Sequence, residues 1–176
     1  AQGNRSGSIE SHFLGAVVLN QRKVFGREVD TVEVIDGQQR LTTFFLLLCA
    51  LRHLFRGEPQ AQTIGTLIST SYTATDGETR TSLKLEPRYE NAGEIMKTIV
   101  ELNADPEATR TGIQVLGVPS FGSLENLVNA YGTIFRYLRD NYDDKPKLKK
   151  YWGYLANSVV FIQISADVST ALKIFE

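Results

Sequence analysis

The residues best suited to do chemistry lie in one segment, Ile35-Asp36-Gly37-Gln38-Gln39-Arg40-Leu41-Thr42-Thr43. A short apolar strand precedes an Asp-Gly turn, and polar residues then occupy the first turn of a very apolar helix. The first backbone N–H groups of a helix have no partner inside it and carry partial positive charge, so they bind phosphate well. Glycine before such a helix lets another group approach the backbone closely. The segment therefore predicts a phosphate-binding strand–turn–helix.

The side chains of this segment have roles that suit such a site. Arg40 offers a forked donor that matches phosphate oxygens, and Thr42 and Thr43 offer hydroxyls. The carboxylate of Asp36 can hold Mg²⁺, orient a water or receive a sugar hydroxyl. The segment is not a Walker A loop, because Gly-x-x-x-x-Gly-Lys-Ser/Thr is absent.

Each of these side chains also has a purely structural interpretation, and the residues alone leave both open. Asp36 can cap the helix, Arg40 can pair with a carboxylate at the edge of the sheet, and Gln38 and Gln39 can be solvated residues of the first turn. An Asp-Gly hairpin is disfavoured, because the apolar stretch that follows is too long for a strand and repeats every three or four residues.

The composition is that of an ordinary globular domain. The chain has 176 residues, 42% of them hydrophobic and 22% charged, with a net charge of -1. Such values argue against whole-chain disorder and against a protein that coats nucleic acid by bulk charge. The longest apolar run, Phe44–Leu51, is too short for a bilayer, which needs about 20 residues. The N-terminus does not have the pattern of a signal peptide.

Cysteine and histidine usage narrows the chemistry further. The single cysteine, Cys49, excludes an internal disulfide and is expected to be a buried structural thiol, so we expect a reducing, cytoplasmic compartment. The two histidines, His12 and His53, are far apart in sequence and show no metal-ligand spacing. We therefore expect no zinc site and no HNH-type nuclease centre in this chain.

The spacing of hydrophobic residues along the chain predicts strands, then helices, then a strand and a helix. This order predicts an α+β fold with a small sheet under a helical layer. Two neighbouring strands are expected at Phe13–Leu19, which should be buried, and at Thr31–Ile35. A central helix, apolar nearly all round, should follow over Gln38–Phe55. The other expected elements are a helix at 61–71, a hairpin at 72–85 around Asp76-Gly77, a helix at 90–102, a loop at 103–122, helices at 124–142 and 147–157, a strand at 159–164 and a helix beginning at Asp167.

Asp36-Gly37-Gln38-Gln39-Arg40, in this strand and helix context, resembles the signature of the DGQQR domain. That domain forms the N-terminal part of GmrSD-type modification-dependent (type IV) restriction enzymes and of related SspE anti-phage proteins. Three further segments resemble the same family: Phe13–Leu19, Ser82–Glu86 and Ala171–Glu176. The resemblance extends over about residues 12–176.

This resemblance implies a ParB/sulfiredoxin-like fold with a small mixed sheet, and binding and hydrolysis of a nucleoside triphosphate with Mg²⁺. It assigns Gly37, Gln38, Gln39, Arg40 and Thr42 to the nucleotide. It makes Asp36 and Arg40 the catalytic pair, with Asp36 as the metal ligand. It does not distinguish GTP, UTP, CTP and ATP. It also implies coupling to modified phage DNA and to a nuclease domain or subunit outside this chain.

Two departures from the family pattern accompany the resemblance. The family's upstream Tyr-Gln-Arg stretch and its downstream Asn-x-Arg-Gly segment are missing from the sequence. We therefore expect residues 12–176 to be an NTPase domain cut at both ends. Residues 1–11 begin with a polar stretch rich in glycine and serine, and we expect them to be a flexible lead or an internal loop.

Contacts to DNA and the mode of action are less determined by the residues. Arg22, Lys23, Lys149 and Lys150 are candidate DNA contacts, with plain surface lysines and arginines as the alternative. A nucleotide- or DNA-sensing module without turnover, and an interaction domain in which the turn is only a helix cap, remain alternatives to the NTPase. The oligomeric state is open, a homo-oligomer included.

Overall fold

The computed structural model describes residues 11–20, 31–87, 92–115, 117 and 122–166. Three predictions lie outside these ranges. They are the flexible lead or internal loop over residues 1–11, of which only residue 11 is described, the DNA contacts at Arg22 and Lys23, and the helix expected from Asp167 onward, which includes the family-like segment Ala171–Glu176.

A three-stranded mixed sheet forms the base of the fold. Its strands are β1 (His12–Asn20), β2 (Val34–Asp36) and β5 (Val159–Ala166), in the order β2-β1-β5. β1 pairs with β2 antiparallel and with β5 parallel. The expected pairing of the first two strands is confirmed, although β2 is shorter than predicted. The α+β class is confirmed too, and the ParB/sulfiredoxin-like assignment stays a prediction.

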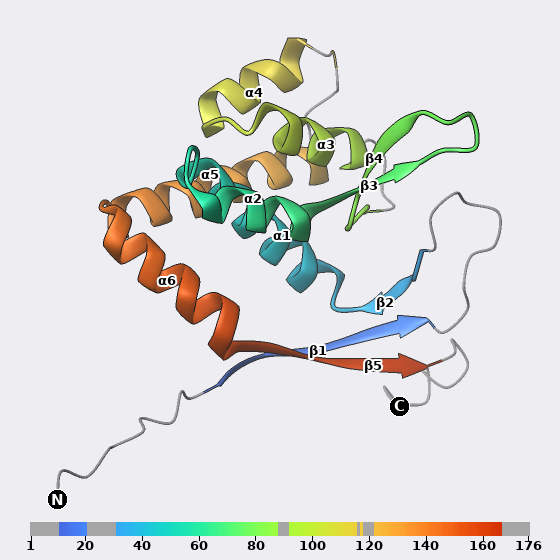
Figure 1. The fold of residues 1–176 in the computed structure, drawn as a ribbon, viewed down its shortest axis with the longest axis horizontal. Helices are drawn as coiled ribbons and strands as arrows, with labels where there is room; N and C mark the ends of the chain where they lie inside the picture. Colours follow the sequence, from blue (N-terminus) through green and yellow to red (C-terminus); the bar gives the residue numbers. More distant parts are fainter. Residues whose placement is uncertain (1–10, 21–30, 88–91, 116, 118–121, 167–176) are drawn as a thin grey trace, which may run out of the picture.

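The helices lie on one side of this sheet (Figure 1). They are α1 (Gln38–Leu54), α2 (Pro59–Ile68), α3 (Ala92–Leu102), α4 (Pro106–Val115), α5 (Ser123–Asn141) and α6 (Lys145–Ser158). α1 is the central helix, as predicted, and it packs against α2 and α5. Its residues Leu46, Cys49, Ala50 and Leu51 are at most 3% exposed. Among the described residues, no helix combines the length and apolarity that a membrane crossing requires.

A separate two-stranded hairpin projects from the helical layer. β3 (Ser69–Thr73) pairs antiparallel with β4 (Thr79–Leu83), and Thr70 faces Ser82 across the ladder. Asp76-Gly77 forms the turn, and Gly77 has a φ of 85°. The predicted hairpin is confirmed, and Figure 1 shows it beyond the end of the sheet that carries β2.

The loop predicted over residues 103–122 is wrong, because α4 occupies Pro106–Val115. Asp105 caps this helix: its Oδ1 accepts a hydrogen bond of 2.9 Å from the backbone N–H of Ala108. Pro106 suits the first turn, where a backbone N–H has no helical partner. Thr109 and Ile113, four positions apart, are buried. Only these two residues define the inner face of the helix. The helical period in the sequence was therefore weak, and the polar composition favoured the prediction of a loop.

The strand at Phe13–Leu19 is only partly buried, which corrects the prediction of a buried strand. Phe161 of β5 points to the helical side and meets the ring of Phe44 at 5.3 Å between centroids. On β5, alternate residues face the other side, and there Ile162 is 53% exposed. Phe13 of β1 is 54% exposed. The described helices cover one face of the sheet, so part of its other face remains accessible.

Candidate functional site

The turn between β2 and α1 has the geometry that the motif predicts. Gly37 is buried at the N-cap position with a φ of 89°, in the left-handed region that favours glycine. A Cβ at Gly37 would lie 3.2 Å from the backbone oxygen of Ala16 and 3.2 Å from Cγ2 of Val17. The turn therefore packs directly on β1, and a side chain at Gly37 would push it away.

The N-terminus of α1 is open. No side chain of the described residues caps it, and its first turn contains no acidic residue. The interpretation of Asp36 as a helix cap is therefore wrong for this structure. The partial positive charge of the first N–H groups is left for another anion to balance.

Arg40 is held in place by two acceptors. Its Nη1 donates to the backbone oxygen of Ala16 at 2.6 Å, and its Nη2 donates to Oδ2 of Asp36 at 2.9 Å. The Asp36 and Arg40 side chains are 42% and 41% exposed. Such an exposed i,i+4 pair adds little to stability. The pair fixes the guanidinium beside the turn. Asp36 belongs to the edge strand β2, so this contact agrees with the structural interpretation in which Arg40 pairs with a carboxylate at the edge of the sheet.

The motif residues divide between two sides of α1. Arg40 faces the sheet, as does Phe44 one turn later. Gln38, Gln39 and Thr42 border a cavity on the other side, as 3.6 residues per turn requires. Gln38 also donates from Nε2 to the backbone oxygen of Val34 at 2.9 Å, which ties it to β2. The structure thus gathers the five-residue motif at one helix end, with a basic side and an amide side.

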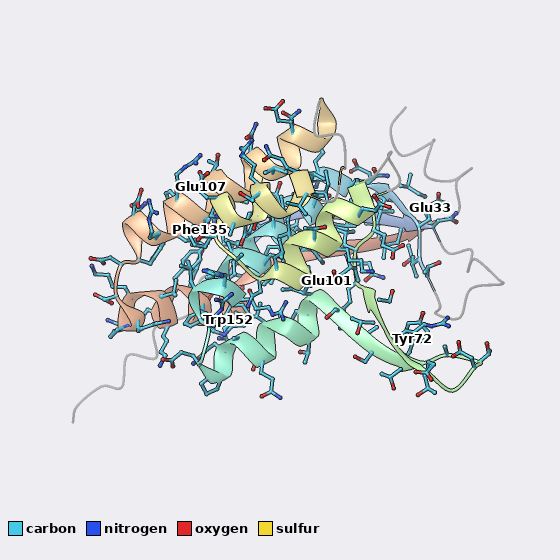
Figure 2. All side chains as sticks on the ribbon, turned by 90° about the horizontal axis from the view of Figure 1, so that it is seen from above. Glu33, Tyr72, Glu101, Glu107, Phe135 and Trp152 are labelled. Carbon is cyan, nitrogen blue, oxygen red and sulfur yellow. The ribbon has the colours of Figure 1, made fainter. Side chains whose placement is uncertain are left out.

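The cavity has a volume of about 1320 Å³ and three walls. One wall is the start of α1 with the segment that leads into β2, the second is the hairpin, and the third is α5. Figures 1 and 2 agree that the hairpin, with Tyr72, and the residues around Glu33 lie at the same end of the molecule. The polar lining residues other than Gln38, Gln39 and Thr42 are Thr31, Glu33, Thr43, Thr70, Tyr72, Ser82, Lys84, Glu86 and Asn126.

The sequence reasoning missed the hairpin wall. Thr70 and Ser82 are direct partners in the ladder, so they share a face. Tyr72 follows Thr70 by two positions and Lys84 follows Ser82 by two positions, so both are on this face, in opposite directions along the antiparallel ladder. All four border the cavity. The strand Ser69–Thr73 is composed of serine, threonine and tyrosine throughout, so no alternation marked that face, and nothing in the chain order showed that it would meet α1.

One buried hydroxyl at the cavity wall has no hydrogen-bond partner. Oγ1 of Thr31 is buried and unpaired within the described structure, and Thr31 borders the cavity. Buried polar atoms are almost always paired.

Asp36, the expected Mg²⁺ ligand, already has a partner in this structure. Its carboxylate is engaged by the positive Arg40 guanidinium, and the described residues contain no group of three His, Cys, Asp or Glu side chains placed to hold a metal. Mg²⁺ at nucleotide sites is held largely by the phosphates and water, with one or two carboxylates. The role of Asp36 as a metal ligand stays a prediction.

The lysines at the start of α6 are engaged within the protein. Nζ of Lys149 lies 2.9 Å from Oε2 of Glu58, and Nζ of Lys145 donates to the backbone oxygen of Leu54 at 2.5 Å. Lys150 borders a shallow groove beside Tyr151. Contacts of Lys149 and Lys150 with DNA stay a prediction, and the ion pair of Lys149 favours its surface interpretation.

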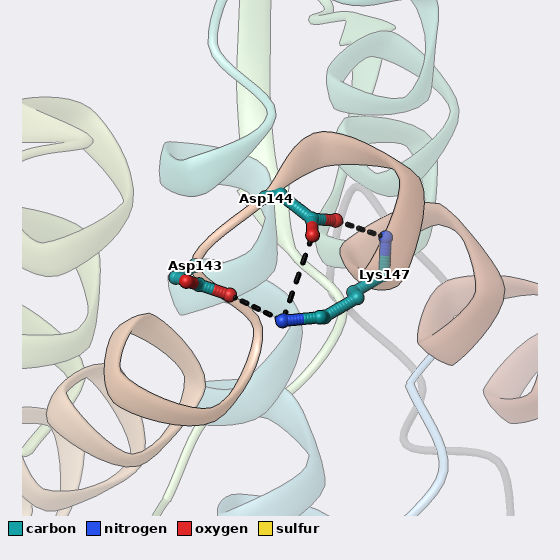
Figure 3. Close-up of polar contacts among 3 residues, drawn as sticks. All are labelled: Asp143, Asp144 and Lys147. Atoms are coloured by element: carbon teal, nitrogen blue, oxygen red, sulfur yellow. Dashed lines mark hydrogen bonds and ion pairs between the residues drawn. The ribbon is translucent and has the colours of Figure 1, made fainter.

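Asp143 and Asp144 surround Lys147 at the same helix start (Figure 3). Nζ of Lys147 lies 2.8 Å from Oδ1 of Asp143, and its backbone N–H donates to Oδ1 of Asp144, the N-cap of α6. The Lys147 hydrogen bond lowers the pKa of Asp143, and Asp143 raises the pKa of Lys147. These carboxylates offset the positive charge that a DNA backbone would need.

Cys49 is buried in α1, as predicted, and should be unreactive in the folded protein. Burial raises the pKa of its thiol from 9.0 to about 12. The thiolate is the nucleophile, so we expect iodoacetamide to leave native Cys49 unmodified near neutral pH and to alkylate it after denaturation. The raised pKa of Cys49 also makes stability depend on pH. The folded state keeps the thiol proton more tightly than the unfolded chain does, so the free energy of unfolding should fall as pH rises from about 9 toward 12. Mass spectrometry after alkylation and urea titrations across that range measure both effects. Rapid native labelling would show that the thiol is accessible.

Fold and site together define a small α+β domain whose central helix starts at an open turn beside a large, partly polar cavity. The chain belongs to the family described as the N-terminal domain of GmrSD restriction endonuclease, whose family model matches residues 4–176. Among curated proteins, none matches the chain. Membership supports a role in restriction and defence, and a restriction-enzyme family implies DNA and a nuclease domain among its partners.

Proposed function

We propose that this chain binds a nucleoside triphosphate in the cavity beside α1 and hydrolyses it to regulate a DNA-restriction effector. One observation carries the proposal: the open N-terminus of α1, with Gln38, Gln39 and Thr42, borders a cavity of about 1320 Å³. Ligand pockets commonly measure about 300–1,000 Å³, so this space accommodates a nucleotide.

The two ends of a triphosphate have different walls to meet. The phosphates are placed at the α1 N-terminus, where backbone N–H groups and the Thr42 hydroxyl donate to anionic oxygens. Lys84 on the opposite wall supplies a positive charge to the same group. The nucleoside is placed toward the hairpin, where Tyr72 offers an aromatic face and Thr70 and Ser82 offer hydroxyls.

Arg40 lies on the sheet side of α1 and is not among the residues that border the cavity. We propose that the terminal phosphate reaches around the N-terminus of α1 to the Arg40 guanidinium, which holds the bound phosphate and stabilises the charge that develops during phosphoryl transfer. The Ala16 carbonyl and Asp36 engage one N–H on each terminal nitrogen, and a guanidinium carries five. The remaining donors are fixed in direction and partly exposed, which is what electrostatic catalysis requires. Asp36 serves as the orienting partner of Arg40 in this arrangement. A sensing module that binds without turnover would use the same contacts, but Arg40 would not have to stabilise the charge of phosphoryl transfer.

The proposed coupling extends beyond the chain. Nucleotide binding or hydrolysis would gate a nuclease domain or subunit that acts on modified phage DNA in the cytoplasm. This rests on the restriction family and on the net charge of -1, which suits a regulatory domain better than one that grips DNA alone.

Replacing Lys84 by alanine should weaken triphosphate binding about tenfold or more. A charge-assisted hydrogen bond to phosphate contributes about 1.5–3 kcal/mol, and 1.4 kcal/mol corresponds to tenfold in affinity. Titration calorimetry of the full-length protein with each of the four common triphosphates measures the effect and the nucleotide preference.

Lys97→Ala is the matched control for charge. Lys97 lies on α3 with 65% of its side chain exposed and pairs with Glu101 at 3.6 Å. Its removal should leave the affinity unchanged. Equal losses in the two variants would show a general charge effect and remove Lys84 from the site. Binding without phosphate release would favour the sensing module, and no binding of any triphosphate would refute the proposed function.

A further inference from the structure

β1 contains an irregularity directly beside the motif. Its pairing register with β5 shifts between Phe13 and Ala16, and Gly15 within this interval has a φ of 113°. L-residues with a side chain rarely adopt such a backbone conformation. β-bulges of this kind often redirect a neighbouring group near a functional site.

The space above Gly15 is filled by Arg40. A Cβ built on Gly15 would come closer to Nη1 of Arg40 than real Cβ atoms come to any neighbour, and would lie 3.4 Å from its Cδ and Cζ. The side chain of Arg40 therefore crosses β1 where Gly15 has no side chain. Immediately beyond, Nη1 reaches the backbone oxygen of Ala16.

We infer that Gly15 is a positioning residue for Arg40: its missing side chain leaves the channel through which the guanidinium reaches Asp36 and the Ala16 carbonyl. The functional part of this inference rests on the proposed nucleotide site. The geometric part rests only on the fit between β1 and α1, and it can be tested independently.

The consequence of a side chain at Gly15 falls mainly on Arg40. The atom in conflict is the far end of a long, flexible side chain, which can move aside, whereas backbone could not. A methyl group at this position therefore displaces the guanidinium and breaks both of its hydrogen bonds, while the apolar core of α1 lies elsewhere. The backbone strain at φ 113° adds a separate cost that does not involve Arg40.

A double-mutant cycle of Gly15→Ala and Arg40→Ala in the full-length protein separates these effects. We expect each single variant to bind triphosphate about ten- to hundredfold more weakly, because each removes the placed guanidinium. The double variant should bind no more weakly than Arg40→Ala alone. A merely structural role of Gly15 would instead make the two losses multiply, and that result would overturn the inference.

Thermal melting without nucleotide tests the geometric part and keeps it distinct from the proposed function. Gly15→Ala should lower the melting temperature less in the Arg40→Ala background than in the wild type, since the clash is gone and only the strain remains. Gly77→Ala is the control, because Gly77 has a φ of 85° and a Cβ at this position would have no neighbour within 4 Å. Its cost should therefore be the same in both backgrounds. If no triphosphate binds but this coupling appears, the proposed function fails and the positioning of Arg40 stands. Equal melting shifts of Gly15→Ala in both backgrounds would refute the positioning.

Discussion

Arg40→Ala should reduce nucleotide-dependent phosphate release about 10²- to 10³-fold in the full-length protein. Removing one preorganised donor to a developing negative charge has a cost of this size in other enzymes. In this protein the guanidinium is held by hydrogen bonds to Ala16 and Asp36, so it does not have to be reoriented when the negative charge develops. The exposed ion pair itself contributes little to stability, so a fall in the melting temperature should come mainly from the lost hydrogen bond to the Ala16 carbonyl. Steady-state phosphate release, with and without modified DNA, measures the effect.

Arg80→Ala provides a control of the same type. Arg80 pairs with Asp76 four positions earlier, and both side chains are 48% exposed on the hairpin. The control thus removes an arginine from an i,i+4 aspartate pair that does not belong to the motif. Phosphate release should stay at the wild-type rate. If Arg40→Ala also kept the wild-type rate, the guanidinium would serve only to connect α1 with β1. The proposed role of Arg40 in phosphoryl transfer would then be wrong.

Leu51→Ala should lower the free energy of unfolding by about 2–5 kcal/mol, the range for leucine truncation in a well-packed core. Leu51 is 0% exposed on α1, within the cluster that α1 forms with α2, α3 and α5. The motif lies at the other end of α1, away from Leu51. The truncation should therefore leave nucleotide affinity unchanged as long as the domain remains folded. Urea denaturation gives the free energy, and titration in the absence of urea gives the affinity.

Leu67→Ala is the comparison, since Leu67 on the neighbouring α2 is 46% exposed. A surface truncation of this kind usually changes stability by less than about 0.5 kcal/mol. Similar losses for Leu51 and Leu67 would mean that α1 is not the central buried helix. A large loss confined to Leu51 supports the placement of the motif on the most stable element of the domain.

The sequence was sufficient for the elements with strong periodicity. α1 has apolar residues on nearly every face, and its start at the Asp-Gly turn was defined by residue chemistry. The hairpin was identified from its Asp-Gly turn between threonine-rich arms. α4 was not, because only Thr109 and Ile113 face the core, and a helix with so narrow an inner face resembles a polar loop.

The site was predictable in part, for a similar reason. The motif is local, so its residues and the turn geometry could be inferred from their order. Its division into a side toward β1 and a side toward the cavity depends on tertiary packing. Lys84, Tyr72 and Asn126 reach the cavity from distant segments, and no local pattern connects them to α1. The close approach of Gly15 to Arg40 likewise depends on how β1 packs against α1, which no local pattern encodes.

Photo-crosslinking tests the central claim most directly. An azido-substituted triphosphate would be irradiated with the full-length protein, and the modified peptides would be mapped by mass spectrometry. We predict adducts on the cavity walls, within residues 31–46, 70–87 and 126–130, that disappear when excess unmodified triphosphate competes. Adducts confined to other segments, such as α6, or labelling that unmodified triphosphate does not reduce, would contradict a nucleotide site at this motif.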